Sequence, residues 1–382
     1  MEGTWPGLVA ERRDRILNAA DAEEFEKEVH SLVSQLGVSH IGFFHRNANR
    51  VPARRSICAT FRGEETDHGR RWIFEDIHED GPASRAGFEG GDIVLRINGR
   101  EIHAPEDPVF PMGTNTAVTV LKPDGRQVMV NLPVPPTKSK KFPYCEPRLV
   151  SYRRLEDGIG WLKVSMFPGQ VGIDIAHDID KAVAELGAID RLIVDLRGNS
   201  GGGLGMIRLM SYFTPGRVPI GYSLTRRRAE RGYRREELSR FKRIPSKKIA
   251  LLWLLMRYGF VDKSITLVTE GMGPKTFHGR MVLLINEHSA SASEVIAAFA
   301  AENKFATLVG SPTVGRLLSG DSFRVGSGFI LVVPTAAYIT WQGTLIEGKG
   351  VRPDILIDWS PERARAGGDN QLERAIEVVK GL

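Results

Sequence analysis

The chain has 382 residues, of which 42% are hydrophobic and 26% are charged, and its formal net charge at pH 7 is +6. This length exceeds one ordinary core, so we expect two or three globular domains rather than a disordered chain. The longest apolar run, residues 249–256, is too short to span a bilayer, and Cys58 and Cys145 show no spacing typical of a disulfide scaffold or a metal site.

Residues 1–50 are predicted to form a helical N-terminal region. Two helices are expected between residues 8 and 37, with Asp21 able to cap the second and Gly37 following its end. The pair Ser39-His40 comes next in a turn, before a strand begins. The N-terminus lacks a basic region followed by an apolar core, so we expect a cytoplasmic protein, with a trimmed secreted protein as the alternative.

Between residues 56 and 135, short β-rich runs alternate with turns such as Asn98-Gly99. This segment resembles a PDZ domain, most closely in the run Gly-Asp-Ile-Val-Leu-Arg-Ile-Asn-Gly at residues 91–99. The resemblance implies a domain that binds an extended peptide by adding a strand to a sheet edge. A PDZ-like spacer with a closed groove is the alternative.

A proline-rich linker at residues 132–138 precedes a segment in which strands and helices alternate, which predicts an α/β layer architecture. We divide the remainder into a core at residues 145–365, with a basic insertion at 215–275, and a C-terminal helix at 366–382. The strands and helices expected in this core are the strands 159–164, 191–196, 281–285 and 329–334 and the helices 171–186 and 294–301.

Much of the positive charge lies between residues 226 and 248, which include eleven arginines and lysines. This basic block could be a solvated amphipathic helix or a gate that favours acidic substrates. It could also tether the protein to nucleic acid or to an anionic membrane. We favour the solvated or gating interpretation and expect no nucleic-acid partner, because no nucleic-acid-binding signature accompanies the block.

Residues 289–294, Ser-Ala-Ser-Ala-Ser-Glu, lie between an apolar strand and a predicted helix. A hydroxyl residue at such a turn exposes its Oγ where backbone N–H groups converge, as an acyl-transfer nucleophile requires. The alternative is a serine-rich helix N-cap.

Residues 195–203, Asp-Leu-Arg-Gly-Asn-Ser-Gly-Gly-Gly, also follow a buried strand. Glycines let the backbone turn sharply and present N–H groups to an anion. A phosphate cradle is disfavoured because the Walker and dinucleotide-binding spacings are absent, so we predict an oxyanion hole, with a simple strand-to-helix turn as the alternative. Its donors would be the N–H groups of Gly201 or Gly202 and of Ala292.

Two further motifs follow at residues 309–315 (Val-Gly-Ser-Pro-Thr-Val-Gly) and 348–354 (Gly-Lys-Gly-Val-Arg-Pro-Asp). In this order the four motifs resemble those of the C-terminal processing peptidase family of serine proteases, which includes tail-specific proteases and the tricorn protease core, over residues 20–360. An inserted PDZ domain is typical of that family. The resemblance implies a multi-domain fold with an α/β (crotonase-like) core and a serine endopeptidase acting on peptides or protein tails. It implies no metal or organic cofactor.

One departure from the tail-specific branch concerns the base. That branch uses a Ser–Lys dyad, and Arg316 stands where the lysine is expected, 25 positions after Ser291. The spacing favours Ser291 as nucleophile over Ser289 or Ser293. Arg316 cannot be the base, because a guanidinium does not deprotonate in proteins.

The tricorn-like branch uses a Ser–His–Ser–Glu tetrad, in which the base is a histidine. This chain resembles that branch in its residues Ser39, His40 and Glu347. By this resemblance His40 is the general base of Ser291, and Glu347 orients its imidazole through Ser39. His288 is a competitor because it is close to Ser291 in sequence. If no base is present, the alternative is an inactive peptide-binding scaffold of the same fold. The oligomeric state stays open.

Overall fold

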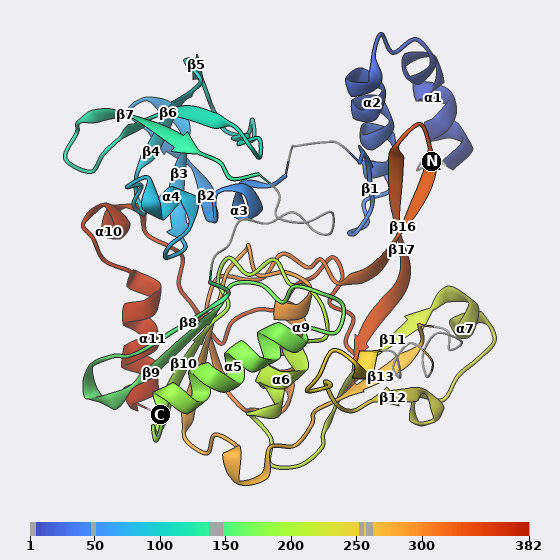
Figure 1. Cartoon of the computed structure of the whole chain (residues 1–382), viewed down its shortest axis with the longest axis vertical. Coiled ribbons are helices and arrows are strands. Elements are labelled where there is room, and N and C mark those ends of the chain that lie inside the picture. The colour runs from blue at the N-terminus through green and yellow to red at the C-terminus, as the bar shows by residue number, and fades with distance from the viewer. Residues whose placement is uncertain (1–4, 47–50, 137–147, 252–255, 257–262, 382) are drawn as a thin grey trace.

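Three six-stranded sheets organise the described chain, which comprises residues 5–46, 51–136, 148–251, 256 and 263–381 of a computed structural model (Figure 1). The first sheet lies in the PDZ-like segment and the second is the centre of the core. The third pairs a strand from the N-terminal region with strands from the later half of the chain. The arrangement confirms the expected multi-domain α/β fold class. The exact domain boundaries stay predictions, and residues 137–147, with the end of the linker and Cys145, lie outside the described residues.

The N-terminal region forms the two expected helices, α1 (Trp5–Leu17) and α2 (Ala22–Ser34). Asp21 caps α2, since its Oδ1 accepts the Glu24 N–H at 2.8 Å. Strand β1 (Gly42–His45) then pairs antiparallel with β17 (Phe329–Thr340). The pairing places the turn before β1, which carries Ser39 and His40, beside the later half of the chain.

The PDZ-like segment forms a sheet of order β2-β3-β4-β6-β7, with β5 beside β4. At the Asn98-Gly99 turn both residues have positive φ (49° and 80°), as a tight hairpin requires. Whether this domain is a PDZ domain stays a prediction. Its elements are α3 (Ala53–Ser56), β2 (Ala59–Thr66), β3 (Gly69–Ile77), α4 (Pro82–Arg85), β4 (Ile93–Ile97), β5 (Arg100–Glu101), β6 (Asn115–Leu121) and β7 (Gln127–Pro133).

The core sheet has the order β18-β15-β14-β10-β9-β8, and every neighbouring pair is parallel except β8 with β9. Its strands are β8 (Val150–Arg154), β9 (Gly160–Val164), β10 (Arg191–Asp195), β14 (Arg280–Ile285), β15 (Thr307–Gly310) and β18 (Ile355–Leu356). Helices α5 (Ile173–Leu186), α6 (Met206–Ser211) and α9 (Ala292–Glu302) cover one face, and α11 (Asn370–Gly381) covers the other.

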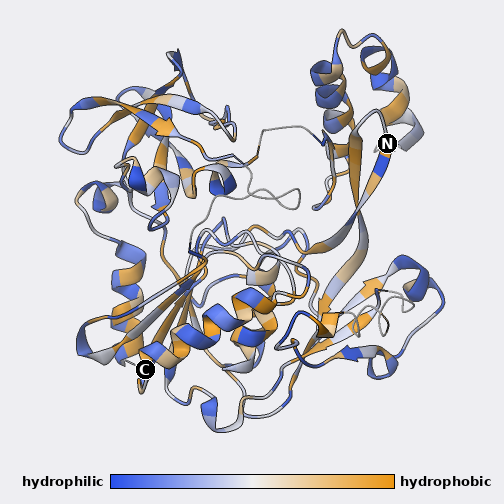
Figure 2. Cartoon of the chain, viewed as in Figure 1, coloured by the Kyte–Doolittle hydropathy of each residue, from blue (hydrophilic) through white to orange (hydrophobic). Residues whose placement is uncertain are grey.

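Strand β14 shows why this sheet is buried on both sides. Its residues alternate, so Leu283 packs with the helices of one face while Val282 and Leu284 pack against α11 on the other. A strand covered on both faces reads as a continuous apolar run, which is the pattern that predicted it. In Figure 2 the strands of this sheet are hydrophobic, and α5 presents both a hydrophilic and a hydrophobic side.

The third sheet has the order β1-β17-β11-β13-β12, with β16 also paired to β17. Its other strands are β11 (Pro219–Thr225), β12 (Ser239–Phe241), β13 (Ile265–Val268) and β16 (Leu318–Gly326), and α7 (Arg226–Glu230) follows β11. The short elements η1 (Glu156–Gly158), η2 (Arg235–Glu237), η3 (Gly273–Lys275) and α10 (Pro361–Arg365) complete the described fold. No helix in this part of the chain is both long enough and apolar enough to cross a membrane.

The basic block of residues 226–248 lies on α7, η2, β12 and the loops around them, with most of its cationic side chains exposed. Some are paired locally, as Arg226 is with Glu230 at 2.7 Å and Arg234 with Glu237 at 3.4 Å. The arrangement is compatible with a solvated face, and the function of the block stays a prediction.

The PDZ-like sheet is docked on the core through buried polar contacts. Lys163 of β9 pairs with Asp76 at 2.6 Å, and Asn286 donates to Glu75 at 3.3 Å. The buried Arg54 donates its Nε–H to the carbonyl oxygen of Gly198 at 2.6 Å. The loops that follow β10 and β14 are therefore in direct contact with this domain.

A buried ion-pair network joins the end of β10 to the start of α11. Arg197 contacts Asp195 at 2.7 Å and Asp369 at 2.8 Å, and Asp195 is fully buried. We expect Arg197→Ala to destabilise the protein by about 3–5 kcal/mol, because it leaves a buried carboxylate unpaired. The matched control Arg374→Ala breaks an exposed pair with Glu377 and should cost under about 1 kcal/mol. Equal shifts of the thermal unfolding midpoint in the two variants would contradict this expectation.

Candidate active site

The candidate site lies where two parallel strands of the core sheet end. Asp195 of β10 is in register with Leu284 of β14, so the loops that follow these strands emerge side by side. Hydrogen bonds join the loops: Ala290 N donates to Asn199 O at 3.0 Å, and Gly198 N donates to Asn286 Oδ1 at 3.1 Å. The glycine motif and the serine motif, which are separated in sequence, thus form one surface.

The backbone of Ser291 is strained. Its φ of 54° and ψ of −113° lie outside the regions that L residues normally adopt, at a cost of about 1–3 kcal/mol. Ser291 directly precedes α9, so its side chain projects from a sharp strand-to-helix turn. This is the geometry of a nucleophile elbow.

The other two serines of the motif are occupied. Ser289 and Ser293 are fully buried, and their hydroxyls donate to the carbonyl oxygens of Leu196 at 2.8 Å and Asn199 at 3.1 Å. Ser291 is partly exposed. Of the three hydroxyls, the one on Ser291 is therefore the one accessible to a substrate.

The glycine loop packs directly against the serine turn. A Cβ at Gly201 would lie 2.5 Å from the Ser291 Cβ and 2.9 Å from the Ala292 nitrogen, and the φ of Gly201 is 91°. At Gly202 the φ is 137°, and a Cβ would collide with the Phe167 carbonyl. Glycine is required at both positions, by the close approach and by the backbone conformation.

The structure corrects one of the expected oxyanion donors. The N–H of Gly201 already donates to Asn199 Oδ1 at 2.8 Å, so it is not free to bind an oxyanion, and the sequence prediction for this residue is wrong. The N–H groups of Gly202 and Ala292 make no hydrogen bond within the described residues. The N–H of Ala292 also lies at the N-terminal end of α9, where the helix dipole is positive.

Ser39, His40 and Glu347 form a continuous hydrogen-bonded chain. Ser39 Oγ donates to Glu347 Oε2 at 2.8 Å and lies 2.9 Å from His40 Nδ1, while Ser39 N donates to Glu347 Oε1 at 2.8 Å. Since the Ser39 hydrogen points to the carboxylate, its oxygen accepts from His40 Nδ1–H. This assigns the ring proton to Nδ1 and leaves the lone pair of Nε2 free to accept a proton.

Two consecutive residues link this chain to the nucleophile turn. The carbonyl oxygen of Arg316 accepts the Ser291 N–H at 3.1 Å, and Leu317 N donates to Glu347 Oε2 at 2.6 Å. The hydrogen bonds of the described residues include none between His40 and Ser291. Catalytic hydrogen bonds of this kind often tighten only when substrate is bound, and here the base and the nucleophile are connected through the segment Arg316-Leu317.

The environment of His40 favours the neutral imidazole. Desolvation by the surrounding chain lowers the pKa of His40 from its ordinary value of 6.5, the nearby Glu347 carboxylate raises it, and the guanidinium groups of Arg316 and Arg55 lower it further. The net shift is downward. A neutral imidazole at neutral pH is the form that can accept a proton.

Glu294 is a site residue that the sequence indicated only as part of a helix cap. Its buried carboxylate accepts the Ser291 and Arg316 N–H groups at 2.9 Å each, and the Gly315 N–H and the Thr313 hydroxyl at 2.7 Å each. Burial raises the pKa of Glu294, and these four donors oppose that shift. The Ser-x-x-Glu spacing signalled a capping contact, but the contacts to residues 313–316 had no sequence signal.

The structure directs the imidazole of His288 toward the PDZ-like sheet, so His288 is not the base for Ser291. Its Nε2 lies 2.9 Å from Glu75 Oε2 on the PDZ-like sheet. Burial alone would lower the pKa of His288, but Glu75 and Glu287 raise it above its ordinary value. The ligand atoms of these three residues lie within 4.8 Å of one another, which is compatible with a metal ion, although Glu287 also pairs with Arg62 at 3.0 Å. The cluster joins the two domains.

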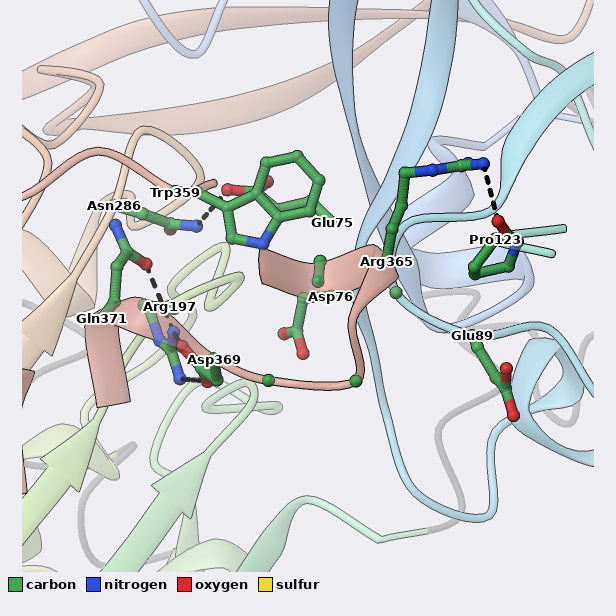
Figure 3. Close-up of a pocket in the computed structure, with 14 residues that line it drawn as sticks. Glu75, Asp76, Glu89, Pro123, Arg197, Asn286, Trp359, Arg365, Asp369 and Gln371 are labelled. Carbon is green, nitrogen blue, oxygen red and sulfur yellow. Dashed lines mark hydrogen bonds and ion pairs between the residues drawn. The ribbon is translucent and has the colours of Figure 1, made fainter. Parts of the chain in front are cut away.

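A second polar feature is a pocket of about 360 Å³ at the junction of the PDZ-like sheet and the core (Figure 3). Asp76, Arg197 and Asp369 line this pocket. Arg197 is paired with Asp369, and Asp76 is paired with Lys163. Ser291, His40 and Glu347 do not line this pocket. It therefore lies outside the candidate active site.

The profile described as Peptidase family S41 matches residues 158–357, more than half of the chain. The chain belongs to peptidase family S41. This confirms the resemblance to the C-terminal processing peptidases, a family of serine-type hydrolases. The S41 profile includes Gly202, Ser291 and Glu347, whereas His40 and Ser39 lie before it.

Named relatives and a solved structure agree with the family. The carboxy-terminal-processing protease of Bartonella bacilliformis is 24% identical over 73% of this chain and 57% of that protein. Tricorn protease homolog 1 of Streptomyces coelicolor is 22% identical over 98% of this chain and 32% of that protein. The structure of mature CPAF complexed with lactacystin aligns with a TM-score of 0.60 at 14% identity, over 98% of this chain and 91% of that one, which supports the fold. The chain thus spans under two thirds of the length of these two curated relatives.

In this S41 family member we expect Glu294→Gln to loosen the nucleophile turn. A glutamine offers one acceptor oxygen, so its amide nitrogen would face donors that the carboxylate now satisfies, at a cost of about 3 kcal/mol. Hydrogen exchange followed by mass spectrometry should show faster exchange of the amides at residues 291, 315 and 316. The control Thr313→Val removes one of the four donors and should have a smaller effect. Unchanged exchange in Glu294→Gln would show that the carboxylate does not hold the turn.

Proposed function

We propose that this chain is a serine endopeptidase that cleaves peptides or protein tails through an acyl-enzyme on Ser291. The observation that carries the proposal is the hydrogen-bonded chain Glu347–Ser39–His40, which is joined to the strained serine turn through the consecutive residues Arg316 and Leu317. Family membership supports the reaction class. The assignment of roles rests on the geometry.

In the first step Ser291 Oγ attacks the scissile carbonyl carbon, and its proton passes to His40 Nε2. The tetrahedral intermediate then breaks the C–N bond, and His40 delivers that proton to the leaving amine. In the second step His40 accepts a proton from water as the water attacks the acyl ester. The product acid leaves, and the proton returns to Ser291.

Glu347 and Ser39 act on the base rather than on the substrate. The carboxylate holds the serine hydroxyl, which holds Nδ1–H, so the ring keeps one tautomer and one orientation. When Nε2 takes up a proton, the nearby negative charge of Glu347 stabilises the imidazolium. The N–H groups of Gly202 and Ala292 would bind the oxyanion, each contributing about 3 kcal/mol.

The substrate class that suits this site is an extended polypeptide, and no organic cofactor or metal is needed for the steps above. We further propose that the PDZ-like domain binds a segment of the substrate by strand addition and delivers it to the core. Its contacts to Gly198 and Asn286 place it against the loops of the active site. A cytoplasmic location stays a prediction.

The competing function is an inactive peptide-binding scaffold. Arg316 in place of a lysine base favours it, as does the lack of a hydrogen bond from His40 to Ser291 in the described residues. The two functions differ in one property, the reactivity of the Ser291 hydroxyl.

A fluorophosphonate probe tests that reactivity directly. We expect wild type to be labelled, Ser291→Ala to be unlabelled and His40→Ala to be labelled about 100-fold more slowly or worse, because the general base is lost. The control His103→Ala removes an exposed imidazole of the PDZ-like domain and should label as wild type does. Normal labelling of His40→Ala would refute the base assignment, and no labelling of folded wild type would favour the scaffold.

The pH dependence of kcat/KM on a quenched fluorescent peptide gives a second test. The pKa of His40 is lowered and the neutral form is active, so the rate should fall on acidification with a midpoint below 6.5. Glu347→Gln removes the charge that raises this pKa, so its midpoint should move to lower pH and its plateau should fall about 100-fold. The control Glu377→Gln, on the exposed side of α11, should change neither. An upward shift in Glu347→Gln would contradict the assigned role.

A further inference from the structure

Arg316 is fixed beside the nucleophile by its backbone. Its N–H donates to Glu294 Oε2 at 2.9 Å, and its carbonyl oxygen accepts the Ser291 N–H at 3.1 Å. A residue bonded at both backbone groups to the nucleophile turn has little freedom to move away from it. Its side chain therefore starts from a defined point at the site.

The guanidinium of Arg316 has no acceptor among the described residues. Its side chain makes no hydrogen bond or ion pair with any residue of the described ranges, and the residue is exposed. Guanidinium groups are strongly suited to bind carboxylates in a bidentate manner. An arginine without a partner at an active site is thus a candidate to bind an anionic group of the ligand.

The two carboxylates nearest to Arg316 in the hydrogen-bond network are already occupied. Glu294 is buried and bound by three N–H groups and a hydroxyl. Glu347 accepts from Ser39 and Leu317. Each of these carboxylates is committed to neutral donors within the fold, so neither pairs with the guanidinium.

The guanidinium charge acts at the reacting groups. Arg316 and Arg55 both lower the pKa of His40, so their positive charges lie close enough to the imidazole to affect its protonation. The acidic chain Glu347–Ser39 lies behind the imidazole, on its Nδ1 side. The positive charge of Arg316 thus lies close to the reacting groups, and it makes no ion pair with a carboxylate of the described residues.

We propose that Arg316 is a specificity-determining residue that binds a carboxylate of the substrate close to the scissile bond. The inference rests on the proposed peptidase function and adds a substrate class to it. The residue that cannot serve as base because it keeps its charge at all pH values is, for the same reason, suited to hold an anion. The carboxylate has two sources, an Asp or Glu side chain or the C-terminal end of a polypeptide tail.

Digestion of a peptide library, with the cleavage sites mapped by mass spectrometry, tests the preference without assuming the position of the acidic group. Wild type should enrich Asp and Glu at one position next to the cleaved bond, or should cut at a fixed distance from free C-termini. Arg316→Gln should lose that enrichment, and Arg316→Glu should favour Lys and Arg at the same position. The control Arg374→Gln, an exposed arginine of α11 outside the basic block, should keep the wild-type profile.

Matched peptides that differ by Glu, Gln or Lys at the enriched position, each with a free or an amidated C-terminus, separate the two sources. A charge-assisted contact should favour Glu over Gln in kcat/KM by about tenfold or more, mainly through KM. A free C-terminus in place of an amide should have that effect if the terminal carboxylate is the ligand. Arg316→Gln should bring the kcat/KM ratio that is large in wild type, either Glu over Gln or free over amidated C-terminus, close to one.

Fluorophosphonate labelling of Ser291 distinguishes failure of this inference from failure of the enzymatic function. A wild type that is labelled and cleaves peptides without acidic or C-terminal preference overturns the role of Arg316 and leaves the peptidase proposal standing. A preference that persists in Arg316→Gln overturns the role of Arg316 in the same way. A folded wild type that neither reacts with the probe nor cleaves any peptide overturns both.

Discussion

The geometry of the candidate site depends on the carboxylate of Glu347. It accepts two hydrogen bonds from Ser39, 308 positions earlier in the chain, and one from Leu317. These contacts hold the turn that carries His40 against the loop that carries Arg316, and that loop is bonded to Ser291. Without this carboxylate the turn with the imidazole would be attached to the later half of the chain through the β1–β17 pairing and the packing of α2 and β1 on Phe329.

A second carboxylate, that of Glu294, holds the nucleophile turn in the same way. Ser291 has an unfavourable backbone conformation, which persists only where surrounding contacts over-determine it. Glu294 provides such contacts from inside the fold by binding the serine turn and residues 313–316 together. The two acidic residues thus act as structural anchors, one for the base and one for the nucleophile, and they meet at the pair Arg316-Leu317.

The sequence was sufficient for much of this arrangement because its signals were local. Continuous apolar runs predicted the strands that are buried on both faces, and the serine turn was predicted from its place between a strand and a helix. The spacing to Arg316 already favoured Ser291 over Ser289 and Ser293. That the other two hydroxyls donate to carbonyl groups of a loop almost a hundred residues away could be found only in the structure.

The errors have the same origin. Glycines at residues 201 and 202 look equivalent in sequence, yet the side chain of Asn199 folds back to occupy one N–H group and leaves the other. The partners of Glu294 beyond its own helix turn, and those of His288 on the PDZ-like sheet, are likewise tertiary contacts. Such contacts between distant segments produce no periodicity or spacing pattern, so they cannot be predicted from a single sequence.

The pairing of β1 with β17 has a consequence for the order in which the protein becomes competent during synthesis. The imidazole of His40 is made first, the hydroxyl of Ser291 about three quarters of the way along the 382 residues, and the carboxylate of Glu347 after both. A nascent chain halted before residue 347 has its hydroxyl but not the group that aligns its proton acceptor. The hydrogen-bonded chain that orients the imidazole therefore forms only after residue 347 has been made, later in translation than both the imidazole and the serine turn.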